Sequence, residues 1–288
     1  MHPVLFTIPS PFYYLLGLGP ELFPVHLYGI LIASGFLVAM NLSRKQAERE
    51  QEDPEQVADL AFLSLVAGLI GARIVFIFTK FDEYVENPAE IVMFWKGGLV
   101  FYGGFIGAAV FIAYYSRKHR IDFFKTADIL IPYLAMAHAF GRLGCLAAGC
   151  CFGQPTDLPW GIVFPITSMT HAQQARDGLV AAHEHPLPVH PTQLYEAGAE
   201  LVLFAVLLLM RTRKRFHGQL FLIWLACYSV IRSVIETMRG DTERGLYYGL
   251  STSQWISLGV AIAAVVLFVT LRRRRVSLAQ ATQATAAA

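Results

Sequence analysis

A histidine and an arginine stand one helical turn apart in a stretch that otherwise consists of small and apolar residues. The stretch is HAFGRLGCLAAGCC, residues 138–151, and the two residues are His138 and Arg142. An arginine at the centre of a bilayer costs roughly 2.5–3.5 kcal/mol on insertion scales, so a function is expected for it. The planar guanidinium suits phosphate, and an imidazole suits proton transfer near neutral pH. The pair therefore indicates an anion site with a proton acceptor beside it, and packing against a neighbouring helix is the alternative for His138.

Other charged residues fall in equally apolar surroundings. They are Arg73, Arg232, Glu196, Glu200 and Glu236. One interpretation is that the arginines pair with the glutamates and hold helices together, and Arg232 and Glu236 have the i,i+4 spacing for such a pair. The other is that three arginines exceed what packing requires and await an anion, for which a phospholipid headgroup is a candidate.

The four cysteines, Cys145, Cys150, Cys151 and Cys227, do not form a disulfide framework, because two of them are adjacent and adjacent cysteines pair only with strain. Small thiols packed between helices are the expected role. A metal or redox site built from His138 and these cysteines is the alternative. The positive charge of Arg142 makes a metal ion at this place less favourable. We therefore predict no metal and no cofactor.

The elements that must position these residues are apolar. The chain has 288 residues, of which 55% are hydrophobic, and a mean hydropathy of +0.49. About seven stretches are long enough to cross ~30 Å of hydrocarbon as helices. They run roughly over 24–43, 57–79, 98–116, 126–148, 191–210, 218–237 and 253–271. Because these runs are continuous rather than alternating, they predict an all-α polytopic membrane protein and not a barrel.

Basic residues cluster after the first, third, fifth and seventh of these stretches, as in Arg272–Arg275 at the end of the last one. By the positive-inside rule the N-terminus is outside and the C-terminus cytoplasmic. These clusters indicate topology, and nucleic-acid binding is not expected.

We expect a single transmembrane catalytic domain over residues 1–275, followed by a disordered tail over 276–288. The longest connection, about 149–190, falls on the outer side and contains GQPTDLPWGIVFP, which cannot remain helical for long. A connection of this length indicates an outer lid or small subdomain.

Four stretches occur together in the order found in one enzyme family. They are VHLYGILI (25–32), GGLVFYGGFIG (97–107), GRLG (141–144) with HPTQLYE (190–196), and YSVIRSVIETMRGD (228–241). In these stretches, which extend over nearly the whole chain, the sequence resembles prolipoprotein diacylglyceryl transferase. The resemblance implies transfer of the diacylglyceryl group of phosphatidylglycerol to the thiol of a lipobox cysteine, with release of glycerol phosphate. It implies as partners phosphatidylglycerol, prolipoprotein signal peptides and membrane lipids, and as location the bacterial inner membrane.

The resemblance also implies roles for single residues. Arg142 would hold the headgroup, Arg232 would activate the leaving phosphate or the thiol, and Glu236 stands one turn after it. With His138 and Tyr102, these three form the expected catalytic set. The expected substrate-binding set is Arg73, Tyr28, His26, Gly103, Gly104, His190, Tyr195, Glu196 and Arg239.

Two departures from the family pattern stand out. Cys145, Ala148 and Cys150 occupy positions where asparagine, asparagine and glutamate are usual, and Tyr102 stands where some members have a histidine that has been assigned a base-like role. Tyrosine is a poorer base than histidine at neutral pH, and His138 is the candidate that compensates. Two other functions stay open: a membrane anion transporter, which would normally show repeated halves, and a divergent member with an altered acceptor.

Overall fold

A computed structural model describes residues 4–9, 22–81, 84, 91, 98, 100–240 and 246–287. The chain divides into two compact units, and each is described by itself. The first unit comprises Met1–Ala39 and Ile131–Ala288, and the second comprises Met40–Leu130. The bounds of helices α2 (Leu27–Arg49) and α6 (Phe123–Ala148) include residues of both units.

The second unit is organised around α3 (Pro54–Thr79) and α5 (Phe101–His119). Helix α3 begins with a proline in its first turn, and the side chain of Asp53 accepts hydrogen bonds from the backbone N–H groups of Glu55 and Gln56. The two helices approach closely at glycines. A Cβ added at Gly107 would lie 2.5 Å from the carbonyl oxygen of Ala67, so only glycine fits there.

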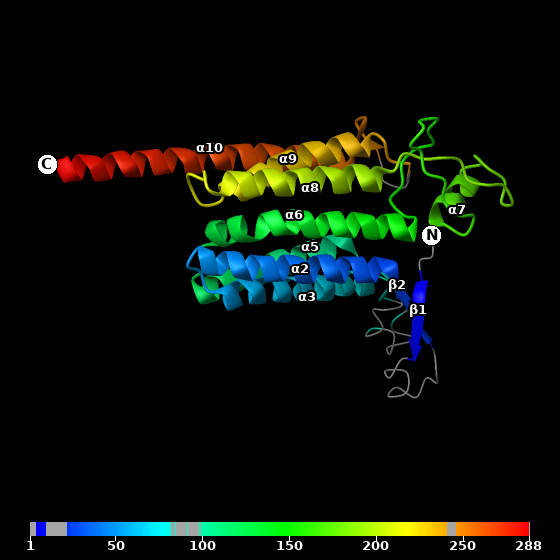
Figure 1. Ribbon diagram of the computed structural model, residues 1–288, viewed down its shortest axis with the longest axis horizontal. Helices are drawn as coiled ribbons and strands as arrows, with labels where there is room; N and C mark the ends of the chain where they lie inside the picture. Colours follow the sequence, from blue (N-terminus) through cyan, green and yellow to red (C-terminus); the bar gives the residue numbers. More distant parts are fainter. Residues whose placement is uncertain are drawn as a thin grey trace. The chain divides into compact units, whose positions relative to one another are not determined.

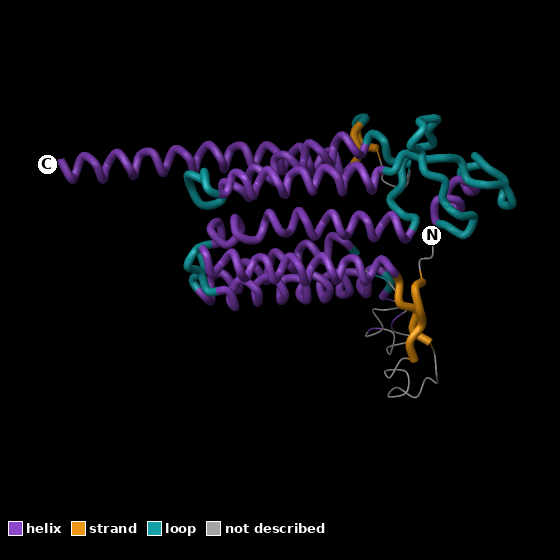
Figure 2. The backbone as a smooth tube through the Cα atoms, viewed as in Figure 1, coloured by secondary structure: helices purple, strands orange, loops and turns teal. Residues whose placement is uncertain are grey.

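The first unit contains α6 from Ile131 onward, together with α8 (Thr192–Arg211), α9 (Gln219–Glu236) and α10 (Thr252–Ala287). Helices α8, α9 and α10 run side by side (Figure 1). Ile131, Leu207 and Leu220 join α6, α8 and α9 in one buried apolar cluster. Figure 2 shows two antiparallel strand pairs of the first unit. They are β1 (Val4–Pro9) with β2 (Leu22–His26), which precedes α2, and β3 (Leu246–Tyr247) with β4 (Leu250–Ser251), which precedes α10.

Six helices of the described residues are long and apolar enough to cross a membrane. They are Leu27–Arg49, Pro54–Thr79, Phe123–Ala148, Thr192–Arg211, Gln219–Glu236 and Thr252–Arg274. Large apolar side chains such as Phe78 and Leu209 are exposed on them, as expected for surfaces in contact with lipid. The prediction of an all-α polytopic membrane protein is confirmed. The remaining predicted span, 98–116, corresponds to α5, which is a helix but does not belong to these six because tyrosines, Arg117 and Lys118 lower its mean hydropathy.

The connection 149–190 has a structure of its own. It contains α7 (Met169–Arg176), which Ser168 caps, and a small apolar core of Phe152, Phe164 and Val189. Isolated bridges pair Pro155 and Ile162 with Val189. The role of this connection as a lid stays a prediction, as does the single catalytic domain. Helix α10 continues to Ala287 and includes most of the segment 276–288, whose disorder also stays a prediction.

Candidate active site

Polar and aromatic residues recur at i,i+4 spacing on three apolar helices of the first unit. This spacing places the residues of each helix on one face, one turn above another. The residues are His138 and Arg142 on α6, Glu196 and Glu200 on α8, and Trp224, Tyr228, Arg232 and Glu236 on α9. We call these eight residues the polar ladder. Contacts between the helices join most of them.

Glu196 connects all three helices of the polar ladder. Its Oε1 accepts a hydrogen bond from Nη2 of Arg142 at 2.7 Å and another from the hydroxyl of Tyr228 at 3.0 Å. The Nε2 of His138 lies 3.8 Å from the same oxygen. Glu196 is only 1% exposed, so a buried carboxylate holds the guanidinium of Arg142 in place.

Glu200 performs a similar task one turn further along α8. Its Oε1 lies 2.8 Å from Nδ1 of His138, and its Oε2 accepts a hydrogen bond from Nε1 of Trp224 at 3.1 Å. The rings of Trp224 and Tyr228 stack with centroids 5.2 Å apart, and the edge of His138 meets Tyr228. The orientation of the imidazole is therefore set by a carboxylate at Nδ1 and by the ring of Tyr228.

Arg232 and Glu236 form the i,i+4 ion pair that their spacing predicts, with Nη2 and Oε2 2.6 Å apart. The same Nη2 donates to the hydroxyl of Ser253 on α10 at 3.3 Å. Tyr228 stands one helical turn before Arg232 on α9 and interacts electrostatically with both Arg142 and Arg232.

The interpretation that arginines pair with glutamates is thus confirmed for Arg142 and Arg232, but the pairs do not use every donor. Nε of Arg142 and Nη1 of Arg232 are buried and have no hydrogen-bond partner among the described residues. A buried N–H of a charged group without a partner is costly. An acceptor oxygen of an anionic ligand is the kind of group that would satisfy each of these donors.

Several other predicted residues also belong to the first unit. Tyr28 is 41% exposed, and its ring lies against the backbone of Gly144, two residues after Arg142 on α6. His26, which ends β2, directly precedes α2. Arg239 is buried, and its backbone bridges to Gly153.

His190 and Tyr195 lie at the start of α8. Nδ1 of His190 is 3.3 Å from the hydroxyl of Tyr195, which also accepts a hydrogen bond from Nε1 of Trp160 at 2.8 Å. Trp160 belongs to the connection 149–190, so this contact ties that connection to the first turn of α8.

The second unit contains the remaining predicted residues. Nε of Arg73 donates to the carbonyl of Ile91 at 3.1 Å, and Nη1 to that of Gly98 at 3.1 Å. Gly103 and Gly104 face α3, where they permit the close helix contact described above. The side chain of Tyr102 is exposed. In the structure, Arg73 forms hydrogen bonds to backbone carbonyls, and Gly103 and Gly104 pack against α3. The predicted contacts of these three residues with the substrate stay predictions.

Three of the four cysteines come together where α6 ends. The sulfur atoms of Cys145, Cys150 and Cys151 all lie within 4.8 Å of one another, whereas Cys227 lies on α9. Hydrogen bonds with the Cys145 and Cys150 thiols, and then the charge of Arg239, lower the pKa of Cys151. Hydrogen bonds with Cys145 and Cys151, and then burial, raise the pKa of Cys150. We call these three residues the thiol cluster.

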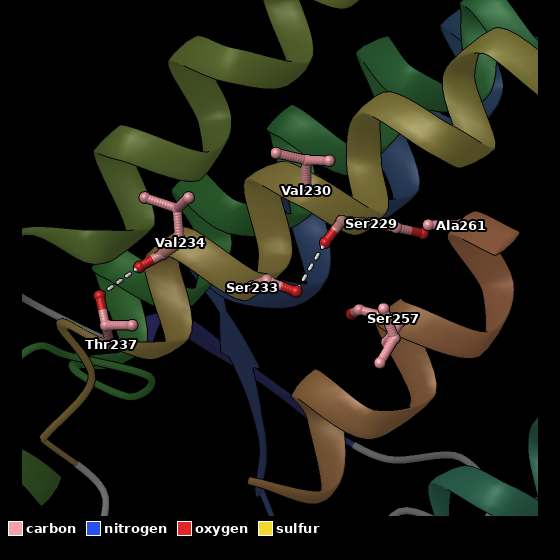
Figure 3. A pocket seen from close by; sticks show the side chains of 8 residues that line it. Ser229, Val230, Ser233, Val234, Thr237, Ser257 and Ala261 are labelled. Carbon is pink, nitrogen blue, oxygen red and sulfur yellow. Dashed lines mark hydrogen bonds between the residues drawn. The ribbon is translucent and has the colours of Figure 1, made fainter. Parts of the chain in front are cut away.

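A groove of about 340 Å³ separates parts of α9 and α10 (Figure 3). Small side chains line it: Ser229, Val230, Ser233, Val234, Thr237, Ser257, Leu258 and Ala261. Ser229 and Ser233 donate their hydroxyls to carbonyls of their own helix, so the lining is effectively apolar. Arg232 is on the same helix and reaches Ser253 of α10.

A family model described as prolipoprotein diacylglyceryl transferase matches residues 15–270 of the chain. The chain belongs to the prolipoprotein diacylglyceryl transferase family. A phosphatidylglycerol–prolipoprotein diacylglyceryl transferase of Clostridium tetani is 32% identical over 268 residues, which cover 93% of this chain and 97% of the relative. The corresponding proteins of Bordetella bronchiseptica and Trichormus variabilis are 35% and 33% identical, over 88% and 83% of this chain and 92% and 82% of their own lengths. The resemblance inferred from the four sequence stretches is confirmed.

Sequence reasoning missed several residues that organise this candidate site. Trp224 and Tyr228 hold the two carboxylates, and Gln193 donates to the carbonyl of Cys150 at 2.7 Å. Trp224 and Tyr228 could have been identified from the unbroken i,i+4 series that runs from Trp224 to Glu236 on an otherwise apolar helix.

Proposed function

We propose that this chain transfers the diacylglyceryl group of phosphatidylglycerol to the thiol of the lipobox cysteine of prolipoproteins, with release of glycerol phosphate. As a member of the family, the chain is a membrane-embedded transferase. The observation that carries the proposal is the pair of buried arginines, Arg142 and Arg232, each held by a carboxylate and each with an N–H that has no partner within the part of the chain that the structure describes.

The arginines have the chemistry that the leaving group requires. When the carbon–oxygen bond to the phosphate breaks, negative charge develops on the departing oxygen. Fixed N–H donors in an apolar surrounding stabilise that charge more strongly than water does, because they need no reorganisation. Glu196 and Glu236 keep the two guanidinium groups in position before the substrate arrives.

His138 is the candidate proton acceptor for the incoming thiol. As the sulfur–carbon bond forms, the thiol proton must leave, and an imidazole accepts it well near neutral pH. Glu200 occupies Nδ1 of the ring, which leaves Nε2 as the position for the proton. In this scheme Glu200 is a positioning residue.

The other first-unit residues would contact the substrates. We assign the headgroup surroundings to Tyr28, His26, His190, Tyr195 and Arg239, and an acyl chain of the donor lipid to the groove between α9 and α10. For Arg73, Tyr102, Gly103 and Gly104 of the second unit, the roles implied by the resemblance stay predictions. We propose that the protein lies in the bacterial inner membrane with its N-terminus outside, since basic residues cluster after the first, third, fifth and seventh apolar stretches.

The test is transfer from phosphatidylglycerol to a lipobox peptide by the purified protein in vesicles, with glycerol phosphate release as the readout. Arg142→Ala should reduce turnover by about 10²–10³, the range for loss of one stabilising donor. That variant also strands the buried carboxylate of Glu196, which destabilises a fold by about 3–5 kcal/mol.

A matched variant separates these two effects. Arg142→Ala with Glu196→Gln removes the stranded charge, so thermal stability should recover while turnover stays low. Turnover that recovers together with stability would exclude Arg142 as a phosphate ligand. A folded wild type that moves free anions across vesicles and releases no glycerol phosphate would instead favour the transporter.

A further inference from the structure

The thiol cluster has the composition of a metal site, although sequence reasoning predicts none. Cys145 lies in the last turn of α6, and Cys150 and Cys151 follow in the connection. Their three sulfur atoms lie within 4.8 Å of one another. A zinc ion with Zn–S bonds of 2.3 Å separates its thiolates by about 3.8 Å. The sulfurs would need to move by about 1 Å or less to reach that spacing.

The backbone is bent so that these thiols converge. Gly149 has a φ of +69°, and Cys151 has a φ of +60°, which is rare for a residue with a side chain. The left-handed conformation is unfavourable for a residue with a side chain, because the Cβ comes too close to the following carbonyl oxygen. Such a conformation persists only where the surroundings enforce it, and it is found disproportionately at functional sites.

The surroundings that enforce this turn are the first residues of α8. Gln193 Nε2 donates to the carbonyl of Cys150 at 2.7 Å, and Thr192 Oγ1 donates to the carbonyl of Cys151 at 2.7 Å. Both donors are almost completely buried. Hydrogen bonds from α8 therefore fix the backbone at Cys150 and Cys151 and so help to hold the two thiols near that of Cys145.

Charge also favours a metal at this place. Three thiolates and one divalent cation carry a net charge of −1. Arg142 acts electrostatically on Cys145, and Arg239 acts on Cys151 through its charge and a hydrogen bond. The two arginines, which would repel a bare cation, stabilise the anionic complex that thiolates form with it.

We propose that Cys145, Cys150 and Cys151 bind a soft metal ion, with Zn²⁺ as the fitting ion. Thiolates select zinc and other soft ions over the hard cations Mg²⁺ and Ca²⁺. Three protein ligands leave the fourth tetrahedral position to water or to an external thiol. The site lies beside the polar ladder and includes none of its residues, so it does not depend on the proposed transfer reaction.

The experiment measures metal content of the purified full-length protein in detergent, under a non-chelating reductant, after incubation with Zn²⁺ and removal of free metal. We expect one zinc per chain in the wild type and in Cys227→Ser, which removes a cysteine outside the cluster. Cys145→Ser, Cys150→Ser and Cys151→Ser should each weaken binding by more than the roughly 10–100-fold that loss of an outer-shell partner costs.

Two further measurements keep the result interpretable. Co²⁺ in place of zinc should give thiolate-to-metal charge-transfer absorption in the wild type, and this absorption should decrease in each cluster variant. Gln193→Leu, which retains all three thiols, should weaken zinc binding by about 10–100-fold while circular dichroism shows unchanged helix content. Zinc binding in folded wild type that is no stronger than in a triple serine variant would overturn the proposal, whatever the transferase assay gives.

Discussion

Glu196 and Glu200 are buried carboxylates that each serve two neighbouring helices. Glu196 accepts from Arg142 and Tyr228, and Glu200 accepts from Trp224 and contacts His138. A buried carboxylate is tolerable only with such partners. At the scale of single residues, the ion pairs are therefore compatible with the proposed anion site, since each pair leaves one buried N–H donor of its arginine without a partner among the described residues.

A role of His138 in proton transfer can be tested against a role in packing. His138→Ala should lower turnover by about 10²–10⁴, the usual contribution of a positioned general base. Glu200→Gln retains a hydrogen-bonding partner for the ring and should lower turnover by much less. Glycerol phosphate release under saturating lipid and peptide is the measurement, and equal small losses in the two variants would return His138 to a packing role.

The sequence allowed most of the charged residues of the site to be chosen in advance, but not their partners. Arg142 and Glu196 are separated by 54 positions in the chain, and His138 and Glu200 by 62. Pairs this distant in the chain depend on which helices are neighbours. The i,i+4 spacing within one helix gives no information on its neighbours. Only Arg232 and Glu236, which share one helix, could be paired beforehand.

At the scale of elements, glycine positions decide how closely α3 and α5 pack. Gly107→Ala would place a methyl group 2.5 Å from the carbonyl of Ala67 and should destabilise the protein by about 1–3 kcal/mol. Gly198 of α8 has nothing within 4 Å of an added Cβ, so Gly198→Ala should stabilise it by about 0.5–1 kcal/mol. Thermal unfolding in detergent measures both, and similar shifts in the two variants would contradict the close contact.

The connection 149–190 gives a second test at this scale. Phe164 is nearly completely buried with Phe152 and Val189, so Phe164→Ala should cost about 3–5 kcal/mol of local stability. We expect faster cleavage of this connection by an added protease, with the helical spans unaffected. Leu158→Ala, at an exposed position of the same connection, is the control and should leave the cleavage rate unchanged.

The membrane-spanning helices were more predictable than the structure of the connection between them. Long apolar runs determine membrane-spanning helices almost by length alone, and the predicted bounds of 191–210 and 218–237 differ by one residue at each end from those of α8 and α9. The interior of the connection 149–190 was not predictable, because its small core depends on Val189 pairing with residues about 25 to 35 positions earlier. The convergence of the three thiols likewise depends on left-handed backbone at Gly149 and Cys151. Of the residues in CLAAGCC, only the glycine favours that conformation.

At the scale of the whole molecule, the distribution of basic residues predicts orientation. Arg272–Arg274 end the last candidate span, so the C-terminus should be cytoplasmic. A fluorescent protein fused there should be bright, and alkaline phosphatase fused at the same place should be inactive. Alkaline phosphatase fused after His183, within the connection 149–190, should be active, and the reverse pattern would refute the orientation.

The two buried carboxylates on α8 also have a consequence for how the protein is made. An acidic helix of this kind enters a bilayer poorly when alone, because each ionised side chain is costly in hydrocarbon. Helix α6, which carries Arg142 and His138, is synthesised earlier, whereas Trp224 and Tyr228 on α9 follow later. We expect α8 to leave the insertion machinery only once it can associate with α6, so that biogenesis, and not catalysis alone, constrains Arg142.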